Sequence, residues 1–250
     1  MEFTVRMAGI NIGIDSQYDT LQRFCKDYCV WGCEPEFAIK IEPEDIEAER
    51  GKDDNIRFRN EYLETIATLR KLAEIFPTRN RILIHGAAIT YGDEGAFLFT
   101  APSGTGKTTH IRMWRKYLGD AVRIVNGDKP FLEIREDSVQ IYGSPWAGKE
   151  NWHKNRDAEL KGICYIKRGE GCSIRRLEPL ECFEWIMSQI HFSSKGEIVD
   201  LTLGHIEKIL EFVPVYELTC DISEEAVKQS FEALTGLEYD KHVMKQEEES

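Results

Sequence analysis

Hydrophobic and polar positions in the first 80 residues follow two different periods. Residues 3–15 ("FTVRMAGINIGID") alternate loosely, which predicts one or two strands, and residues 35–41 ("PEFAIKI") read as a further strand. Residues 60–77 carry apolar side chains at helical spacing, followed by a terminating proline, and predict the clearest helix of the chain. We therefore predict an N-terminal α+β lobe over residues 1–80.

The pattern changes over residues 81–240. Residues 81–101 read as two strands joined by a turn at Gly92–Gly95, and residues 107–117 predict a helix. A short apolar strand that ends in an acid follows at 121–128, and a hairpin at 131–146. Further strands are expected at 158–169, 171–179 and 213–221, the last within a mostly helical final stretch. Strands that alternate with helices predict an α/β fold, followed by an acidic tail at 241–250.

Residues 18–30 ("YDTLQRFCKDYCV") also have helical spacing. If this segment is helical, Cys25, Cys29 and Cys33 lie on one face of the helix. Three thiolates are able to hold a metal ion or an iron–sulfur cluster, but cysteine is also a common buried small hydrophobe. The chain has seven cysteines, an odd count, and we interpret them as free thiols whose role stays open.

Composition narrows the class of protein. Hydrophobic residues make up 42% and charged residues 30% of the 250 residues, as in soluble globular proteins. The formal net charge of −12, without a dominant basic stripe, argues against a nucleic-acid partner. No apolar run approaches the roughly 18 residues that span a bilayer, and no basic segment precedes a long apolar one. We expect a cytoplasmic protein without a membrane partner, and a homo-oligomer stays open.

Residues 97–114 ("FLFTAPSGTGKTTHIRMW") predict a phosphate-binding loop. An apolar strand feeds it, small residues allow the backbone to fold around an anion, and a helix starts at its end. Ala101 replaces the first glycine of the usual pattern, and its single methyl group is compatible with the turn. The residues predicted to bind the nucleotide phosphates are Ser103, Gly104, Thr105, Gly106, Lys107, Thr108 and Thr109.

Three side chains around this loop carry candidate chemistry. Lys107 is positioned to reach the outer phosphates, and Thr108 supplies a hydroxyl ligand for Mg²⁺. Asp128 ends an apolar strand 21 residues after Lys107, where phosphate-loop proteins carry an aspartate that holds Mg²⁺ through a water. His85 precedes the loop by one hairpin, where a histidine taken by itself is more often a core residue than a functional one.

The combination "LIHGAAITYGDEGAFLFTAPSGTGKTT" followed by "VNGDKP" resembles the HPr serine kinase and phosphoenolpyruvate carboxykinase superfamily. The resemblance covers Arg81 to Gly148, about a quarter of the chain. The chain also resembles short bacterial HPr-kinase-like proteins that include peptide-tailoring kinases. This resemblance implies a mixed, bent sheet around a phosphate-loop helix, with ATP and Mg²⁺ or Mn²⁺ as cofactors. It also implies catalytic roles for His85, Lys107 and Asp128.

The chain departs from this family at Gly127, where the kinases carry a first acid near the attacking hydroxyl. The general base is therefore open: His85 or Asp128 takes that role, or Asp128 only holds the metal. Lys149 and Arg156 are candidate contacts of the acceptor, or ordinary surface charges.

Three functions follow from this reading. The first is a kinase that phosphorylates a hydroxyl of a peptide, a protein or a small molecule. The second is a nucleotide-binding accessory subunit of a peptide-modification system with weak or no turnover. The third, lyase chemistry of the carboxykinase kind, fits poorly because those enzymes are about twice as long.

Overall fold

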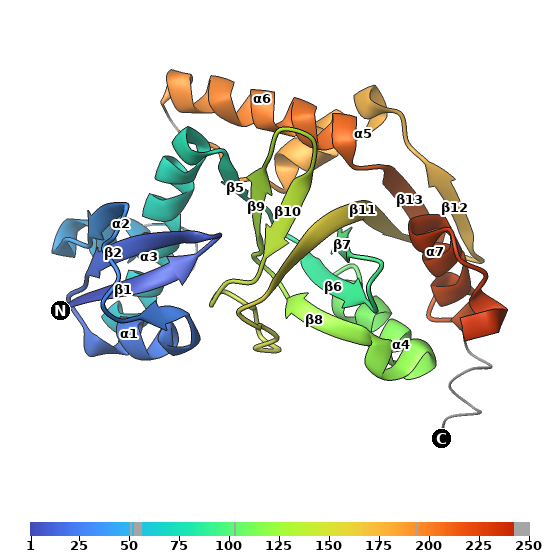
Figure 1. Ribbon diagram of the computed structural model, residues 1–250, viewed down its shortest axis with the longest axis horizontal. Helices are drawn as coiled ribbons and strands as arrows, with labels where there is room; N and C mark the ends of the chain where they lie inside the picture. Colours follow the sequence, from blue (N-terminus) through green and yellow to red (C-terminus); the bar gives the residue numbers. More distant parts are fainter. Residues whose placement is uncertain (51, 53–56, 103, 194, 243–250) are drawn as a thin grey trace.

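The structure is a computed structural model that describes residues 1–50, 52, 57–102, 104–193 and 195–242. It contains a four-stranded sheet near the N-terminus and a nine-stranded sheet that forms the body of the molecule, with helices packed against both (Figure 1). This mixed α/β architecture confirms the fold class predicted from the pattern. Within the described part of the chain, no helix combines the length and the apolar character needed to cross a membrane.

The small sheet has the strand order β3-β1-β2-β4, with β1–β2 and β1–β3 antiparallel and β2–β4 parallel. Its apolar side chains, and those of the long helix α3, enclose one hydrophobic core. The elements of this region are β1 (Glu2–Met7), β2 (Ile10–Asp15), α1 (Asp19–Phe24), η1 (Lys26–Tyr28), β3 (Cys29–Val30), β4 (Phe37–Lys40), α2 (Pro43–Arg50), α3 (Asn60–Ile75) and η3 (Phe76–Arg79).

The large sheet is mixed and bent. Its strands are β5 (Arg81–Leu83), β6 (Ala87–Tyr91), β7 (Ala96–Thr100), β8 (Val122–Asn126), β9 (Phe131–Ile134), β10 (Val139–Tyr142), β11 (Asp157–Arg168), β12 (Ser173–Arg176) and β13 (Val215–Cys220). The main path runs β5-β9-β10-β11-β7-β6-β8, and β13 pairs with both β11 and β12. The long strand β11 pairs with β10 near its start, and with β7 and β13 further along.

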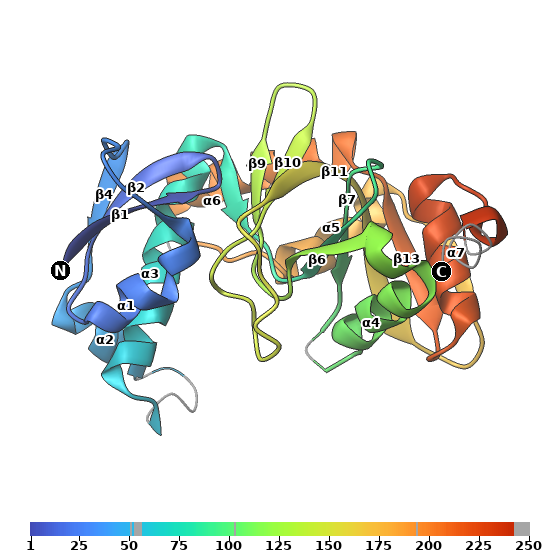
Figure 2. The same ribbon diagram turned by 60° about the horizontal axis from the view of Figure 1, so that its bottom comes forward.

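Helices cover both faces of this sheet, which explains why every residue of β6 and β7 is buried. The helices are α4 (Lys107–Leu118), η4 (Gly119–Ala121), α5 (Pro179–Ser188), α6 (Gly196–Phe212) and α7 (Glu224–Thr235). Alternate side chains of the strands point to opposite faces, so Leu98 packs with α5 and α6 while Phe97 and Phe99 pack with α4 and α7. Figure 2 shows α4 and α6 on opposite sides of the sheet.

The N-terminal region packs against the body through α3 and the segment after it. Phe76, Phe131 and Trp146 belong to the same core as the small sheet. The Trp146 indole Nε1 donates a hydrogen bond of 2.9 Å to the Thr65 carbonyl of α3. Helix α3 is therefore held beside the loops that follow β8 and β10, close to the predicted site.

Two local predictions from the sequence are wrong. The helical segment 18–30 ends at Phe24, because Cys29–Val30 instead pairs with β1 as a strand. Cys25 is buried, Cys29 half-buried and Cys33 exposed, so these cysteines do not share one helical face. The predicted pair of strands over residues 81–101 is three strands, since the chain leaves the sheet between β5 and β6, and His85 lies in that break.

Candidate functional site

The strand directions bring three distant segments to one edge of the large sheet. Strand β6 lies between β7 and β8 and runs antiparallel to both, so its start lies beside the ends of its two neighbours. The residues before β6 include His85, those after β7 form the phosphate loop, and those after β8 include Asp128. The sheet topology therefore gathers the histidine, the loop and the acid, which are spread over more than 40 residues of the sequence.

The phosphate loop leads from β7 directly into α4, which begins at Lys107. Gly104 and Gly106 have φ angles of 78° and 124°, a backbone conformation that side-chain-bearing residues rarely adopt. Neither glycine has a neighbouring atom within 4 Å of a built Cβ, so the backbone rather than space requires glycine here. The N-terminus of a 12-residue helix, preceded by these glycines, is suited to an anion.

Lys107 and Arg168 hold the loop from two sides. The Lys107 ammonium donates a hydrogen bond of 2.9 Å to the carbonyl of Ala101, the first residue of the loop. Arg168, at the end of the parallel strand β11, donates to the carbonyls of Gly104 and Thr105 at 2.6 and 2.8 Å. Both ends of the loop are thus tied by cationic side chains, which also contribute positive charge where phosphates would bind.

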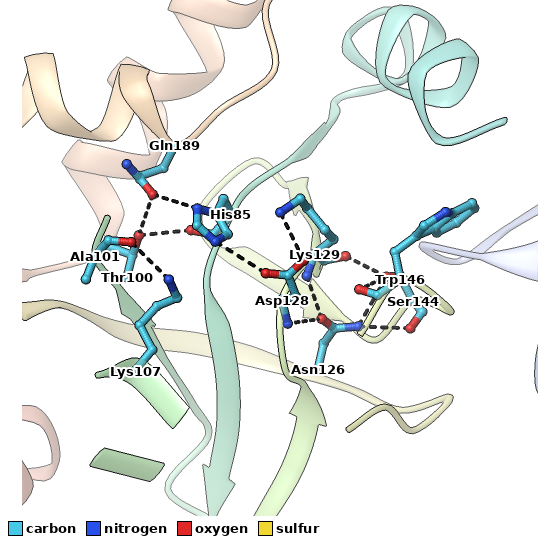
Figure 3. Close-up of polar contacts among 10 residues, drawn as sticks. All are labelled: His85, Thr100, Ala101, Lys107, Asn126, Asp128, Lys129, Ser144, Trp146 and Gln189. Carbon is cyan, nitrogen blue, oxygen red and sulfur yellow. Dashed lines mark hydrogen bonds and ion pairs between the residues drawn. The ribbon is translucent and has the colours of Figure 1, made fainter. Parts of the chain in front are cut away.

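The second half of the site is a chain of polar contacts through His85 and Asp128 (Figure 3). The His85 Nε2 lies 3.3 Å from one oxygen of Asp128, and the Lys129 ammonium donates to the other at 3.1 Å. Burial raises the pKa of Asp128, but the hydrogen bond from His85 and the charge of Lys129 outweigh burial, and the pKa lies below its ordinary value. Asp128 is therefore a carboxylate at neutral pH.

Asp128 and its neighbour Lys129 influence the pKa of Lys107 in the phosphate loop. Burial lowers the pKa of the Lys107 ammonium, the negative charge of Asp128 opposes this change, and the positive charge of Lys129 adds to it. The net direction is downward, because burial disfavours the charged form of a lysine. The loop lysine and the acid after β8 thus belong to one electrostatic site.

Gln189, which ends helix α5, fixes the histidine in this arrangement. Its backbone carbonyl accepts the His85 backbone N–H at 2.7 Å, and its side-chain Oε1 lies 3.0 Å from His85 Nδ1. Thr100, the last residue of β7, donates from its hydroxyl to the His85 carbonyl at 2.9 Å. Because the other ring nitrogen faces Asp128, the imidazole is held between an amide and a carboxylate (Figure 3).

Asn126 fixes the acid in a similar way. Its fully buried side-chain oxygen accepts the backbone N–H groups of Asp128 and Lys129 at 2.8 and 2.7 Å. Its amide nitrogen donates to the Ser144 carbonyl at 2.9 Å. This closes a turn around Gly127 and directs the Asp128 side chain toward His85.

A side chain at Gly127, where the resembled kinases carry an acid, would be crowded. A Cβ built on Gly127 would lie 3.0 Å from the Ala147 carbonyl oxygen and 3.1 Å from the Trp152 Cβ. Ala147 and Trp152 would have to shift by a few tenths of an ångström to admit a side chain here. The departure at Gly127 is part of the packing of this chain, and Asp128 is the acid that this turn presents.

A cavity of about 530 Å³ begins directly beside the loop, between α4 and the ends of β11 and β13. Polar groups of Thr105, Thr109 and Arg168 line it on the loop side, and Met113, Ile166 and Ile222 provide apolar walls. Its size and mixed lining are suitable for an organic ligand of moderate size.

The structure places the remaining predicted residues as follows. Ser103 lies outside the described residues, as do residues 243–250 of the predicted tail. Thr108 and Thr109 lie half-buried in the first turn of α4. Lys149 is exposed and follows Gly148, whose built Cβ would lie 3.1 Å from the Asp128 Cβ, so that turn borders the acid.

Arg156 lies further from this centre. It is half-buried, and its backbone carbonyl accepts the N–H of Gly143 at the start of the loop after β10. Within the described chain, the Arg156 guanidinium has no hydrogen bond or ion pair with the site residues. The structure therefore places Gly148, the residue before Lys149, beside Asp128 and leaves Arg156 on a neighbouring loop.

Sequence reasoning missed Gln189, Asn126, Lys129 and Arg168 as parts of the site. Lys129 was visible in the "GDKP" turn that carries Asp128. Arg168 ends a strand that runs parallel to the one feeding the loop, but the pairing of these strands is not written in the sequence. Gln189 has no local signal, because it lies 104 residues after the histidine that it contacts.

The donor set is compatible with Mg²⁺, which prefers oxygen ligands and retains several waters and phosphate oxygens in nucleotide sites. Thr108 would contribute a hydroxyl and Asp128 a carboxylate, and the lowered pKa of Asp128 favours the ionised form that binds a cation. Among the described residues, no group of three or more histidine, cysteine or acidic side chains forms a separate metal site.

No protein-family model matches the chain, and no curated protein matches it. Among solved structures, the chain is similar to the HPr(Ser) kinase/phosphatase from Coxiella burnetii. The two share 13% sequence identity with a TM-score of 0.35, and the match covers 66% of this chain and 98% of that chain.

Proposed function

We propose that this chain is an ATP- and Mg²⁺-dependent kinase that transfers the γ-phosphoryl group of ATP to a hydroxyl group. The observation that carries the proposal is the His85–Asp128 pair, 3.3 Å apart, at the same sheet edge as the phosphate loop. A phosphate loop alone supports nucleotide binding. An ionised acid paired with a histidine beside it supports chemistry on a nucleophile.

In this proposal the nucleotide phosphates bind the loop residues Gly104–Thr109 and the N-terminus of α4. The nucleoside occupies the cavity of about 530 Å³ that begins at Thr105 and Thr109. Lys107 moves its ammonium from the Ala101 carbonyl to the outer phosphates and neutralises charge there. Thr108 would hold Mg²⁺, with Asp128 contacting the ion through a water, and the ion would supply further neutralisation of the phosphate charge when bound.

The transfer step is an in-line displacement at phosphorus. The acceptor oxygen forms a bond to the γ-phosphorus, the bond from that phosphorus to the β–γ bridging oxygen breaks, and ADP leaves. The acceptor proton passes to the carboxylate of Asp128, with His85 holding that carboxylate in place. A carboxylate with a lowered pKa is a weak base, but phosphoryl transfer depends more on positioning than on a strong base.

We place this activity in residues 81–240, with residues 1–80 as an accessory lobe. The acceptor is a hydroxyl of a peptide, a protein or a small molecule, and Lys149 and Arg156 are proposed contacts of acceptors that approach over the loop after β10. ATP and the acceptor are the expected partners of a cytoplasmic enzyme.

A second function has a specific observation in its favour. Gly127 carries no acid and a side chain there would be crowded, and both oxygens of Asp128 already have a partner in His85 and Lys129. A chain that binds nucleotide but turns it over slowly would act as an accessory subunit of a peptide-modification system. In that case ATP would bind with no phosphorylated product.

The test is a search for a phosphorylated product. The purified chain is incubated with ATP and Mg²⁺ and a panel of hydroxyl-bearing peptides and small molecules, and products are identified by mass spectrometry and ³¹P NMR. The kinase proposal expects an ester phosphate on one class of acceptor, with ADP formed in equal amount. ATP binding without such a product across the panel would favour the accessory function.

A further inference from the structure

A second cavity borders His85, and none of the described phosphate-loop residues is in its lining. Its volume is about 270 Å³, and it is formed between helix α3 of the N-terminal region, the end of α5 and the polar centre of the site. Its lining includes His85 and Lys129, which contact the two oxygens of Asp128, and Gln189, which contacts His85, so Asp128 lies directly behind the lining rather than in it. We propose that this cavity binds the acceptor and presents its hydroxyl to Asp128, an inference that rests on the proposed kinase function.

The contacts of His85 support binding of the nucleotide at the loop and of the acceptor in the second cavity. Its backbone carbonyl is bonded to Thr100, which directly precedes the loop, and its ring nitrogens face Gln189 and Asp128. His85 thus contacts the residue before the loop and also lines the second cavity. A phosphoryl donor on the loop and a hydroxyl in this cavity would meet at the His85–Asp128 pair, as an in-line transfer requires.

The lining predicts the chemistry of the occupant. The walls toward α3 are apolar, formed by Ile66, Leu69 and Ala73, with Leu83 and Ile190 from the body. His85, Lys129 and Gln189 form the part of the lining next to Asp128, where the hydroxyl would be, and Arg70, Ser188 and His191 complete the polar lining. The cavity is small compared with those that hold drug-sized ligands, so it suits one hydroxyl-bearing group with an apolar flank.

The charges of the lining give a second constraint. Arg70 and Lys129 are the strongly basic residues in the lining, and none of the described lining residues is acidic. His191 also lines the cavity, and burial, followed by the charge of Arg70, lowers its pKa, so it is neutral at pH 7. Arg70 is paired with Glu49 and Lys129 with Asp128, so the net field is modest. We therefore expect neutral acceptors to be preferred over cationic ones.

This inference gives the N-terminal region a function. Three of the apolar wall residues and Arg70 belong to α3, which the Trp146–Thr65 hydrogen bond fixes against the body. Residues 1–80 would then select the acceptor, while the body binds the nucleotide. The Lys149 turn borders Asp128 from another direction and would contact only parts of the acceptor outside the cavity.

The experiment uses two hydroxyl probes, N-acetyl-L-threonine methylamide, which is neutral with a methyl flank, and choline, which is cationic. Leu69→Trp fills the cavity from α3, and Tyr62→Trp is the matched control because Tyr62 is half exposed on the same helix and outside the cavity. Phosphorylation of the neutral probe is expected to exceed that of choline. We expect Leu69→Trp to reduce kcat/KM for the neutral probe at least 10-fold, with ATP affinity and Tyr62→Trp kinetics unchanged.

Leu69→Ala covers the case in which the tryptophan variant does not fold, since it enlarges the cavity and should raise KM for the probe. Saturation-transfer NMR of the neutral probe, with no nucleotide present, tests the cavity separately from the kinase activity. Probe binding that Leu69→Trp or Leu69→Ala weakens, without any product, would support the cavity and contradict the kinase. Product formation at the wild-type rate in both Leu69 variants would overturn the cavity and leave the kinase standing. No probe binding by the wild-type chain would also overturn the cavity.

Discussion

The two halves of the candidate site are built in different ways. The phosphate-loop half consists of one continuous segment, in which the Gly104 and Gly106 backbone and the start of α4 supply most of the groups. The His85–Asp128 half is assembled from side chains of three separated segments, held by Gln189 and Asn126. The first half is suited to any nucleotide, while the second makes the site specific for a reaction. Substitutions in the two halves should therefore have separable effects.

The largest effect is expected in the loop half. Lys107→Ala removes the cation that neutralises the outer phosphates, and we expect nucleotide-linked turnover to fall by roughly 10³-fold together with nucleotide affinity. Isothermal titration calorimetry and product formation measure the two quantities. If turnover survived in Lys107→Ala, the loop would not be the phosphate site.

The same lysine predicts a pH effect. Burial lowers the pKa of Lys107, so its charge is lost as pH rises through a value below the ordinary range of lysine. Nucleotide affinity should therefore fall at alkaline pH. Lys107→Arg should flatten this fall, because a guanidinium stays charged.

The next effect is expected in the acid half. Asp128→Asn keeps the size of the side chain and removes its charge, and we expect transfer to fall by about 10²- to 10³-fold. The pKa of Asp128 is lowered, so the carboxylate persists at pH values below the ordinary titration range of an aspartate and is lost only as pH falls through the lowered value. Transfer by the wild-type chain should thus stay flat from neutral to mildly acidic pH. A loss that begins near pH 6 would contradict this assignment.

A smaller effect is expected from the residue that positions the histidine. Gln189→Leu removes the amide oxygen 3.0 Å from His85 Nδ1 while keeping a side chain of similar length. We expect transfer to fall about 10-fold through kcat, with nucleotide affinity unchanged, because Gln189 acts through His85. Glu184→Ala, an exposed position of α5 outside the cavity lining, tests whether any change in this helix has the same result. An equal loss in both variants would mean a general disturbance of α5.

The smallest effect on transfer is expected at Gly127. A methyl group there would lie 3.0 Å from the Ala147 carbonyl oxygen, so Gly127→Ala should lower the free energy of unfolding by about 1–3 kcal/mol, while transfer changes less than about threefold. Denaturant unfolding measures the first quantity. Gly127→Asp should lose more stability and gain no activity. Faster transfer in Gly127→Asp would show that the missing acid, and not packing, sets the rate.

The same comparison explains what the sequence could predict. The loop was readable because its strand, glycines, lysine and helix follow one another, and each has a local signature. Helix α3 and the β9–β10 hairpin were predicted for the same reason and are confirmed. His85 was singled out, but its place in a break between strands was not. The sequence pattern from Ile82 to Thr90 is apolar on both sides of that break, so the interruption has no local signal.

The partners of His85 and Asp128 were beyond such reasoning. The contact between Gln189 and His85 depends on how α5 returns across the sheet, and Arg168 reaches the loop only because β11 pairs in parallel with β7. In the cysteine-rich segment 18–30, a local pattern predicted a helix that the tertiary structure does not form throughout. Its helical spacing was real, but pairing with β1 draws Cys29–Val30 into the small sheet. Tertiary pairing overrode a local period there.

The most direct test of the account is the ratio between nucleotide affinity and phosphoryl transfer in His85→Ala. ATP affinity is measured by calorimetry with Mg²⁺, and transfer by mass spectrometry with the acceptor that the wild-type chain phosphorylates, with Lys107→Ala measured in parallel. The account predicts a loss of transfer of at least 10²-fold in His85→Ala with ATP affinity within about threefold of the wild type. Equal losses of affinity and transfer in His85→Ala would make His85 a structural residue and contradict the division of the site into two halves.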